Sequence, residues 1–258
     1  MQPKQKSLRL RVFAGPNGSG KSTIINAIRD KEVNGFPLDF GHYINADDIA
    51  RHLREGLFDF SAFGVNFTKT DFDAFVEKSG LLNPSFTKKD FRASYSLSGT
   101  VFKAKLVRRI EQLAQVIARY LREALLERET RFSFETVFSH GSNLDIMRRA
   151  AEKGYKVYLY FVSTESAEIN KYRVKLRVAR GGHDVPDDKI ESRYHRSLSL
   201  LADAAEIAYQ AYFFDNSLDD KPFRLIAHFK VVDGKKVWDE PELHLPKWFE
   251  KYFVKQAK

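Results

Sequence analysis

The feature that most constrains the fold is the glycine-rich segment at residues 15–22, which reads Gly-Pro-Asn-Gly-Ser-Gly-Lys-Ser. It matches the phosphate-loop pattern G-x-x-x-x-G-K-[ST] in full. Alternating apolar residues predict a strand over residues 8–14, directly before the loop, and helical spacing continues over residues 23–29. Since this motif functions between a strand and a helix, the context predicts a phosphate-binding loop (P-loop) in an α/β chain.

The chemistry of this loop predicts a nucleoside triphosphate site. Glycines allow backbone N–H groups to surround phosphate oxygens, and the helix N-terminus adds its positive end. Lys21 is expected to reach the β- and γ-phosphates, and the Ser22 hydroxyl to hold Mg²⁺. We predict ATP as the nucleotide, with GTP as the alternative. The predicted nucleotide-binding residues are Gly15, Asn17, Gly18, Ser19, Gly20, Lys21, Ser22 and Thr23.

The composition excludes several classes of protein. The chain has 258 residues, of which 43% are hydrophobic and none is cysteine. Disulfides, thiolate metal sites and a cysteine nucleophile are therefore excluded, and the apolar content is too high for a disordered chain. The longest strictly apolar run, residues 157–162, is too short to span a bilayer, and no signal peptide is visible. We expect a cytoplasmic globular protein without a membrane partner.

The net charge of +9 falls mainly in three segments, residues 4–11, 103–131 and 171–196. A nucleotide phosphate, an anionic substrate or RNA would each account for this charge. Charge alone does not choose among these partners.

Strands and helices are predicted to alternate along the chain. The predicted strands are 42–45, 131–137, 155–162 and 212–215, and the predicted helices are 46–54, 143–153, 166–180 and 187–205. Residues 224–232 and 236–238 flank Asp233-Gly234 and predict a C-terminal hairpin. This pattern indicates an α/β fold of the P-loop NTPase/kinase type, with a mostly parallel sheet flanked by helices.

A helical insertion is expected within this single domain of residues 1–258, at about residues 56–130. The spacing of apolar residues predicts a long amphipathic helix over 101–129. Residues 56–100 are rich in phenylalanine, with interspersed glycine, asparagine and proline, and predict short helices and loops.

Two classes of P-loop protein are excluded by missing motifs. Leu97-Ser98-Gly99 continues with Thr100, so the signature of transporter-type ATPases is absent. The segment 170–173 ends in Arg173, where a guanine-binding motif would have aspartate. Kinases that act on small molecules or nucleotides instead combine a P-loop, an acid at the end of another strand and an arginine-rich lid.

Two acidic residues follow predicted strands. Asp47 comes after strand 42–45 and could accept the proton of a substrate hydroxyl. Alternatively, Asp47 or Asn45 only caps the helix 46–54. Glu135, followed by Thr136, ends strand 131–137 and could orient substrate or Mg²⁺, or it could be a rim carboxylate paired with an arginine.

The arginine-rich segment, about residues 171–197, predicts a lid. Its arginines lie on helix faces on either side of Gly181-Gly182, which would act as a hinge. Closure would bring positive charge over the triphosphate, whereas the alternative is a solvated basic face. The predicted lid residues are Arg173, Arg177, Arg180, Arg193 and Arg196.

These segments together resemble the zeta-toxin family of P-loop kinases, including its shorter chromosomal relatives. The matching pieces are AGPNGSGKST (14–23), INADDIA (44–50), FSFETVFS (132–139), KGYKVYLYFV (153–162), RVKLRVARGGHDVP (173–186), RYHRSL (193–198) and FDNS (214–217). The resemblance implies ATP-dependent phosphorylation of the 3′-hydroxyl of UDP-N-acetylglucosamine, and an antitoxin protein as a partner.

The same resemblance implies roles for individual residues. It points to Asp47 as the catalytic base and Glu135 as a substrate-contacting acid. It also places Arg177 among the phosphate-binding residues and Asn216 near the nucleotide base.

Two other functions remain open at this stage. One is a polynucleotide or nucleoside kinase, for which the basic segment 103–131 would follow a nucleic-acid backbone. The other is a nucleotide-dependent binding module that hydrolyses ATP slowly and has no acceptor.

Overall fold

The structure is a computed structural model that describes residues 7–33, 35–182, 184–219, 221, 223–239 and 244–256. Lys4, Lys6 and His183, from the basic N-terminal segment and the Gly-Gly turn, lie outside the described residues. The chain, expected as one domain, forms two compact units: Met1–Phe40 with Glu135–Lys258 (the P-loop unit), and Gly41–Phe134 (the second unit). No helix in the described part of the chain is long and apolar enough to cross a membrane.

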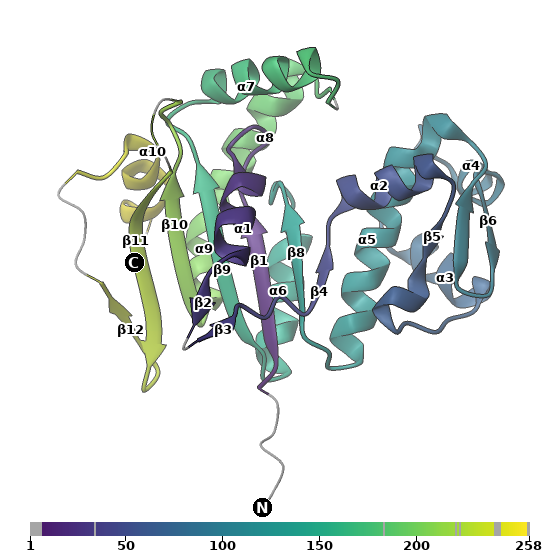
Figure 1. The fold of residues 1–258 in the computed structure, drawn as a ribbon, viewed down its shortest axis with the longest axis horizontal. Helices are drawn as coiled ribbons and strands as arrows, with labels where there is room; N and C mark the ends of the chain where they lie inside the picture. Colours follow the sequence, from purple (N-terminus) through teal and green to yellow (C-terminus); the bar gives the residue numbers. More distant parts are fainter. Residues whose placement is uncertain are drawn as a thin grey trace, which may run out of the picture. The chain divides into compact units, whose positions relative to one another are not determined.

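The P-loop unit is built on a mostly parallel sheet (Figure 1). Its strands, in spatial order, are β12 (Lys235–Trp238), β11 (Arg224–Val232), β10 (Gln210–Asp215), β9 (Lys156–Ser163) and β1 (Arg9–Ala14), followed by the end of β8 (Phe132–Thr136). The pairs β1–β9 and β9–β10 are parallel, while β11 and β12 form an antiparallel hairpin. The predicted α/β fold and C-terminal hairpin are confirmed.

Helices cover both faces of this sheet, with α1 on one face and α6 and α9 on the other (Figure 1). The helices of the unit are α1 (Lys21–Arg29), α6 (Ser142–Glu152), α7 (Ala167–Ala179), α8 (Asp187–Ser199), α9 (Leu201–Ile207) and α10 (Lys247–Phe249), which continues as a π-helical turn, Glu250–Val254. A small hairpin, β2 (Glu32–Val33) and β3 (Phe36–Pro37), follows α1. The single helix predicted over 187–205 is two helices that meet at Leu200.

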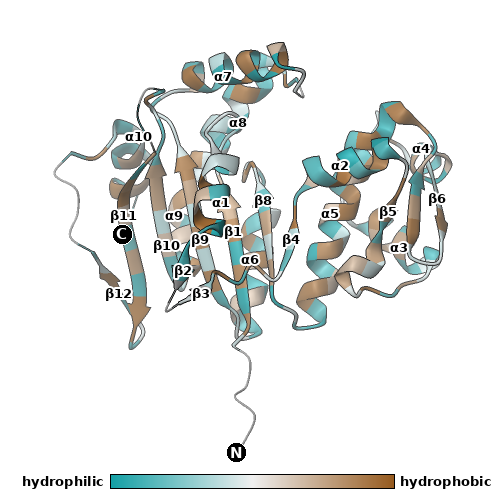
Figure 2. Cartoon of the chain, in the orientation of Figure 1, coloured by the Kyte–Doolittle hydropathy of each residue, from teal (hydrophilic) through white to brown (hydrophobic). Residues whose placement is uncertain are grey.

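The core of the P-loop unit lies on the central strands, which Figure 2 shows as largely hydrophobic. Leu159 and Phe161 of β9 are fully buried, as is Leu10 of β1. Parallel strands covered on both faces require apolar residues almost continuously, so the apolar run of β9 follows from its central position.

The second unit combines helices with a small antiparallel sheet. Its elements are β4 (His42–Ile44), α2 (Ala46–Glu55), β5 (Phe58–Asp59), a 3₁₀ turn (Phe60–Phe63), α3 (Lys69–Lys78), α4 (Lys88–Ala93), β6 (Tyr95–Ser98), β7 (Val101–Ala104), a second 3₁₀ turn (Val107–Arg109) and α5 (Ile110–Glu127). β4 pairs in parallel with the first residues of β8, and β5, β7 and β6 form the small sheet.

Two predictions for this unit are wrong. Residues 56–100 are not only helices and loops, because they contain the strands β5 and β6. The helix predicted over 101–129 begins at Ile110, since residues Val101–Ala104 form β7. β6 and β7 are joined by a tight turn in which Gly99 has φ 58°, a value that favours glycine.

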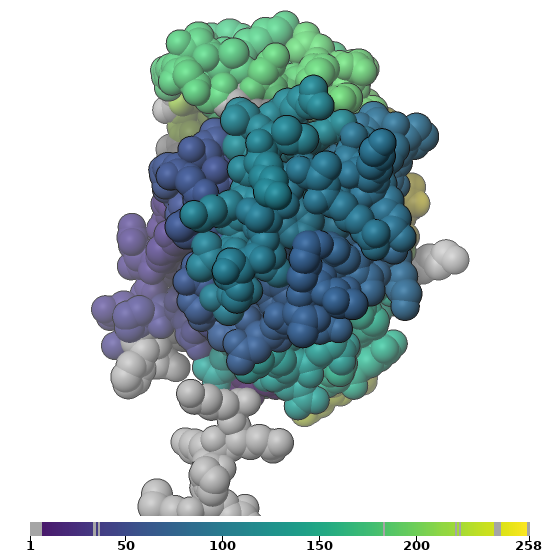
Figure 3. Space-filling model, turned by 90° about the vertical axis from the view of Figure 1, so that its right-hand side faces the viewer, coloured from purple at the N-terminus to yellow at the C-terminus, as the bar shows by residue number. Residues whose placement is uncertain are grey.

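The phenylalanine-rich segment forms an aromatic core inside the second unit. Tyr95 and Phe102 stack across the β6–β7 pair with ring centroids 4.6 Å apart. Phe72 of α3 contacts Phe60, Tyr95 and Phe102 with centroids 5.9 Å apart, and is fully buried. Figure 3 shows residues of this unit that are distant in sequence interleaved on its surface. The aromatic residues therefore hold its short elements together.

We expect Phe72→Ala to lower the free energy of unfolding by about 3–5 kcal/mol, because it leaves a cavity among the aromatic rings that Phe72 contacts. Val107→Ala is the control, since Val107 is 81% exposed and should change stability by less than about 0.5 kcal/mol. Chemical denaturation of both variants measures the difference. Equal stability of the two would show that the aromatic cluster does not form.

Candidate functional site

The P-loop connects β1 to α1 and requires glycine at three positions. Gly15, Gly18 and Gly20 have φ of 147°, 77° and 93°. A Cβ atom at Gly15 would lie 2.0 Å from the carbonyl oxygen of Val162, and one at Gly18 would lie 2.6 Å from that of Asn170. The loop backbone therefore packs directly against the end of β9 and against α7, and no larger residue fits these positions.

The N-terminus of α1 is open to an anion. Gly20 is its N-cap residue, with no side-chain hydrogen bond to the first turn and no acidic residue in that turn. Side chains cap α2, α3 and α4, whereas α5 to α10, like α1, have no side-chain cap. The first N–H groups of α1 and the helix dipole are thus not neutralised by a cap, while Ser22 and Thr23 are exposed there.

Lys21 lies folded over the P-loop and beside Glu135. Its side chain is 8% exposed, and its Nζ donates a hydrogen bond of 3.0 Å to the carbonyl of Pro16. The same Nζ lies 3.9 Å from Oε1 of Glu135, at the end of β8. The structure thus brings together the predicted phosphate-binding lysine and the second predicted acid. The neighbouring Thr136 accepts the backbone N–H of Phe138 at 3.0 Å through its hydroxyl.

Asn216 contacts the P-loop directly. It follows β10, and its Nδ2 donates to the carbonyl of Ser19 at 2.9 Å. Its backbone N–H donates to the carbonyl of Ser163 at 2.8 Å. A Cβ at Gly20 would lie 2.2 Å from this Nδ2. Asn216, the residue predicted to lie near the nucleotide base, therefore packs against the P-loop backbone at Ser19 and Gly20.

The predicted lid arginines have different environments. Arg173 on α7 donates to the carbonyl of Asn216 at 2.6 Å and forms an ion pair with Asp219. Arg193 on α8 places Nη1 3.5 Å from Oδ1 of Asn17 in the P-loop. Burial and the nearby charge of Arg196 lower the pKa of Arg193.

The remaining lid arginines are exposed. Arg177 packs against Gly182, where a Cβ would lie 2.5 Å from its Cγ, and Arg180 ends the same helix. Arg196 donates to the carbonyl of Ser192, one turn earlier in α8, at 3.3 Å. Arg193 thus contacts the P-loop through Asn17.

Asp47 lies in the second unit, exposed in the first turn of α2. The cap of this helix is Asn45, whose Oδ1 accepts the backbone N–H of Asp47 at 2.8 Å. Of the two residues predicted as possible caps, Asn45 is the cap and the carboxylate of Asp47 is not. The adjacent Asp48 pairs with Arg51 at 3.3 Å.

The described residues contain no group of three or more histidine or acidic side chains placed to hold a metal ion. The exposed Ser22 hydroxyl at the open end of α1 is a suitable ligand.

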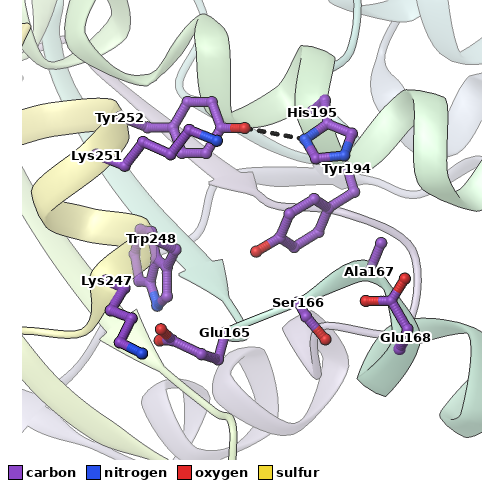
Figure 4. Close-up of a pocket in the computed structure, with 10 residues that line it drawn as sticks. All are labelled: Glu165, Ser166, Ala167, Glu168, Tyr194, His195, Lys247, Trp248, Lys251 and Tyr252. Carbon is purple, nitrogen blue, oxygen red and sulfur yellow. Dashed lines mark hydrogen bonds between the residues drawn. The ribbon is translucent and has the colours of Figure 1, made fainter.

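Sequence reasoning missed the contribution of the C-terminal helix, which is α10 (Lys247–Phe249) together with the π-helical turn Glu250–Val254. Trp248 donates from Nε1 to Oδ1 of Asp215 at 2.9 Å, directly before Asn216. Figure 4 shows Trp248 beside Glu165 in a pocket of the P-loop unit. Trp248, Phe249 and Phe253 are all buried, and their helical spacing was the available signal.

Comparison with known proteins supports the fold. Two crystal structures of the AvrRxo1-ORF1:AvrRxo1-ORF2 complex, one with sulphate ions and one with ATP, match with TM-scores of 0.53 and 0.52. Both have 15% identity and cover 98% of this chain but 65% of the matched chain. A weaker match, with TM-score 0.46, 13% identity and 99% and 82% coverage, is to the PezAT chromosomal toxin–antitoxin system of Streptococcus pneumoniae. The likeness to the two AvrRxo1-ORF1:AvrRxo1-ORF2 structures supports the predicted α/β P-loop fold.

Sequence comparison adds little to this likeness. No protein-family description matches the chain. An uncharacterized protein of Haemophilus influenzae is 36% identical over 63 residues, which is 24% of this chain and 45% of that protein. The chain thus matches less than half the length of this relative.

We expect Asn45→Ala to lower the free energy of unfolding by about 0.5–2 kcal/mol, because the first turn of α2 loses its cap. Asn45→Asp retains a capping oxygen and should be close to wild type. Thermal and chemical denaturation of both variants provide the measurement. If the two substitutions cost the same, the capping role of Asn45 is wrong.

Proposed function

We propose that this protein is an ATP-dependent kinase that transfers the γ-phosphoryl group to a hydroxyl of a small anionic acceptor. The observation that carries the proposal is the P-loop, with three positions that only glycine fits, before the uncapped helix α1 and with Lys21 beside Glu135. The structural likeness to a complex crystallised with ATP supports this choice of nucleotide. This chain covers 65% of the length of that neighbour. We therefore argue the proposed reaction from the residues of this chain and not from the activity of the neighbour.

In this proposal the P-loop binds the phosphates and Lys21 turns toward the outer ones. Loop N–H groups and the N-terminus of α1 surround the phosphate oxygens. Ser22 would hold Mg²⁺, which neutralises phosphate charge during transfer. Phosphate oxygens would replace the carbonyl of Pro16 as hydrogen-bond acceptors for Lys21.

We assign the proton-accepting role to Asp47 and an acceptor-orienting role to Glu135. The capping requirement of α2 is met by Asn45, so the Asp47 carboxylate is available for another role. Glu135 lies beside Lys21, where a carboxylate would face the transferred phosphoryl group. The preferred acceptor is the 3′-hydroxyl of UDP-N-acetylglucosamine, from the family resemblance.

Arg193 and Arg177 are the proposed lid residues that neutralise charge developing during transfer. Arg193 is already near Asn17, and an anion would relieve its partly buried charge. Arg177 is exposed beside Gly182 and would need the lid to move. Because the neighbours include toxin–antitoxin and ORF1:ORF2 complexes, we also propose an antitoxin-like protein partner.

The experiment that tests the function is incubation with γ-labelled ATP, Mg²⁺ and a panel of nucleotide sugars, nucleosides and RNA ends, followed by mass spectrometry. A phosphorylated nucleotide sugar supports the proposal. Labelled RNA ends would favour a polynucleotide kinase, and slow hydrolysis without any labelled acceptor would favour a binding module.

Lys21→Ala should abolish phosphoryl transfer and weaken ATP affinity by about 10–100-fold, the loss of one charge-assisted hydrogen bond. ADP affinity should fall less, since Lys21 is proposed to reach the outer phosphates. Calorimetry with both nucleotides measures this, with the exposed Lys31→Ala as control. Equal ATP affinity in Lys21→Ala and wild type would refute the site.

Asp47→Asn should lower transfer by about 10²–10⁴-fold, because it removes the proton-accepting group but retains the size. ATP affinity and the thermal midpoint should stay near wild type, since the helix cap is Asn45. Asp48→Asn, at the neighbouring exposed position, is the matched control. Full activity of Asp47→Asn combined with inactivity of Glu135→Gln would move the base to Glu135.

A further inference from the structure

The C-terminal helix packs into the P-loop unit against the two strands that end at the site. Trp248 and Phe249 are each 2% exposed. The ring of Trp248 contacts Phe161 of β9 at 6.2 Å between centroids, and that of Phe249 contacts Phe213 of β10 at 5.0 Å. This helix is therefore part of the core beneath the candidate site.

The indole of Trp248 is tied to the loop that follows β10. Its Nε1 donates to Oδ1 of Asp215 at 2.9 Å, and the hydroxyl of Ser217 donates to the same oxygen at 2.6 Å. The Ser217 oxygen also accepts the backbone N–H of Glu165 at 2.9 Å. One carboxylate oxygen thus anchors the residues on both sides of Asn216.

Asn216 has little freedom to move between these anchors. Its N–H is bound to Ser163, its carbonyl to Arg173, and its Nδ2 to the carbonyl of Ser19 in the P-loop. The space beside Nδ2 is filled by Gly20, where even a Cβ would lie 2.2 Å away. A shift of Asn216 would therefore move the P-loop backbone or break its contact with Ser19.

The same helix also contacts the lid. The carboxylate of Glu165 accepts the N–H groups of Lys247 and Trp248, and burial together with the nearby charge of Asp215 raises the pKa of Glu165. One turn further along, the hydroxyl of Tyr252 is hydrogen-bonded to Nδ1 of His195 on α8 at 2.9 Å (Figure 4). The C-terminal helix thus connects the loop after β10 with the lid helix.

We propose that Trp248 is a positioning residue for the nucleoside triphosphate site. Through Asp215 and Ser217 it holds Asn216 against Ser19, and so keeps the P-loop backbone in its phosphate-binding shape. The indole of Trp248 has a single N–H donor. Removing this donor leaves the partly buried Oδ1 of Asp215 with one hydrogen bond fewer. The inference rests on the proposed nucleotide-binding function of this loop.

The test compares Trp248→Phe with Trp238→Phe, which changes the only other tryptophan, a half-exposed residue of β12. Phenylalanine keeps an aromatic ring and removes the N–H donor. We expect calorimetry to show about 10-fold weaker ATP affinity in Trp248→Phe. The ATP affinity of Trp238→Phe should equal that of wild type. Without nucleotide, hydrogen exchange should be about 10-fold faster over residues 15–23 and 215–217 in Trp248→Phe alone.

A second variant keeps the test decisive if Trp248→Phe fails to fold. Ser217→Ala removes the bridge between Asp215 and Glu165 without changing the packing of the indole, and should shift ATP affinity and exchange in the same direction. Unchanged affinity and unchanged exchange in a folded Trp248→Phe or in Ser217→Ala overturn the positioning role. If wild type binds no ATP but Trp248→Phe still accelerates P-loop exchange, the proposed function fails and the positioning role stands.

Discussion

The arrangement of the P-loop unit depends on the close approach of three chain segments to the glycine backbone of residues 15–20. The end of β9 lies against Gly15, α7 lies against Gly18, and Asn216 lies against Gly20. At each point a single Cβ atom would overlap backbone or side-chain atoms of the neighbouring segment. These neighbours fix the shape of the loop together with the internal hydrogen bond from the Ser19 N–H to the carbonyl of Pro16.

The elements predicted correctly are those whose apolar pattern is long or whose ends are marked. β9 carries a continuous apolar run, α6 ends before Gly154, and the β11–β12 hairpin turns at Asp233-Gly234. The second unit was less predictable because its short strands contain only two to four residues each. Segments of that length show no reliable period, and their position is decided by aromatic contacts such as Tyr95–Phe102.

For the candidate site, the sequence predicted the P-loop residues because their motif is contiguous. It could not choose between a catalytic and a capping role for Asp47, since both roles suit an acid after a strand. The hydrogen bond from the Asp47 N–H to Asn45 identifies Asn45 as the cap, and the catalytic role of Asp47 stays a prediction. Trp248 was not predicted as a site residue because its connection to Asn216 passes through Asp215 and depends on how distant segments pack.

The lid arginines show why spacing on a helix does not determine the role of a charge. Arg173 lies beside the carboxylate of Asp219, so its charge is already neutralised and it ties α7 to the loop after β10. Arg193 is partly buried, and this burial together with the nearby charge of Arg196 lowers its pKa. Its Nη1 lies 3.5 Å from Oδ1 of Asn17 in the P-loop, the loop that we propose binds phosphate. In one arginine-rich segment, a neighbouring carboxylate thus gives Arg173 a structural role that its spacing on the helix did not reveal.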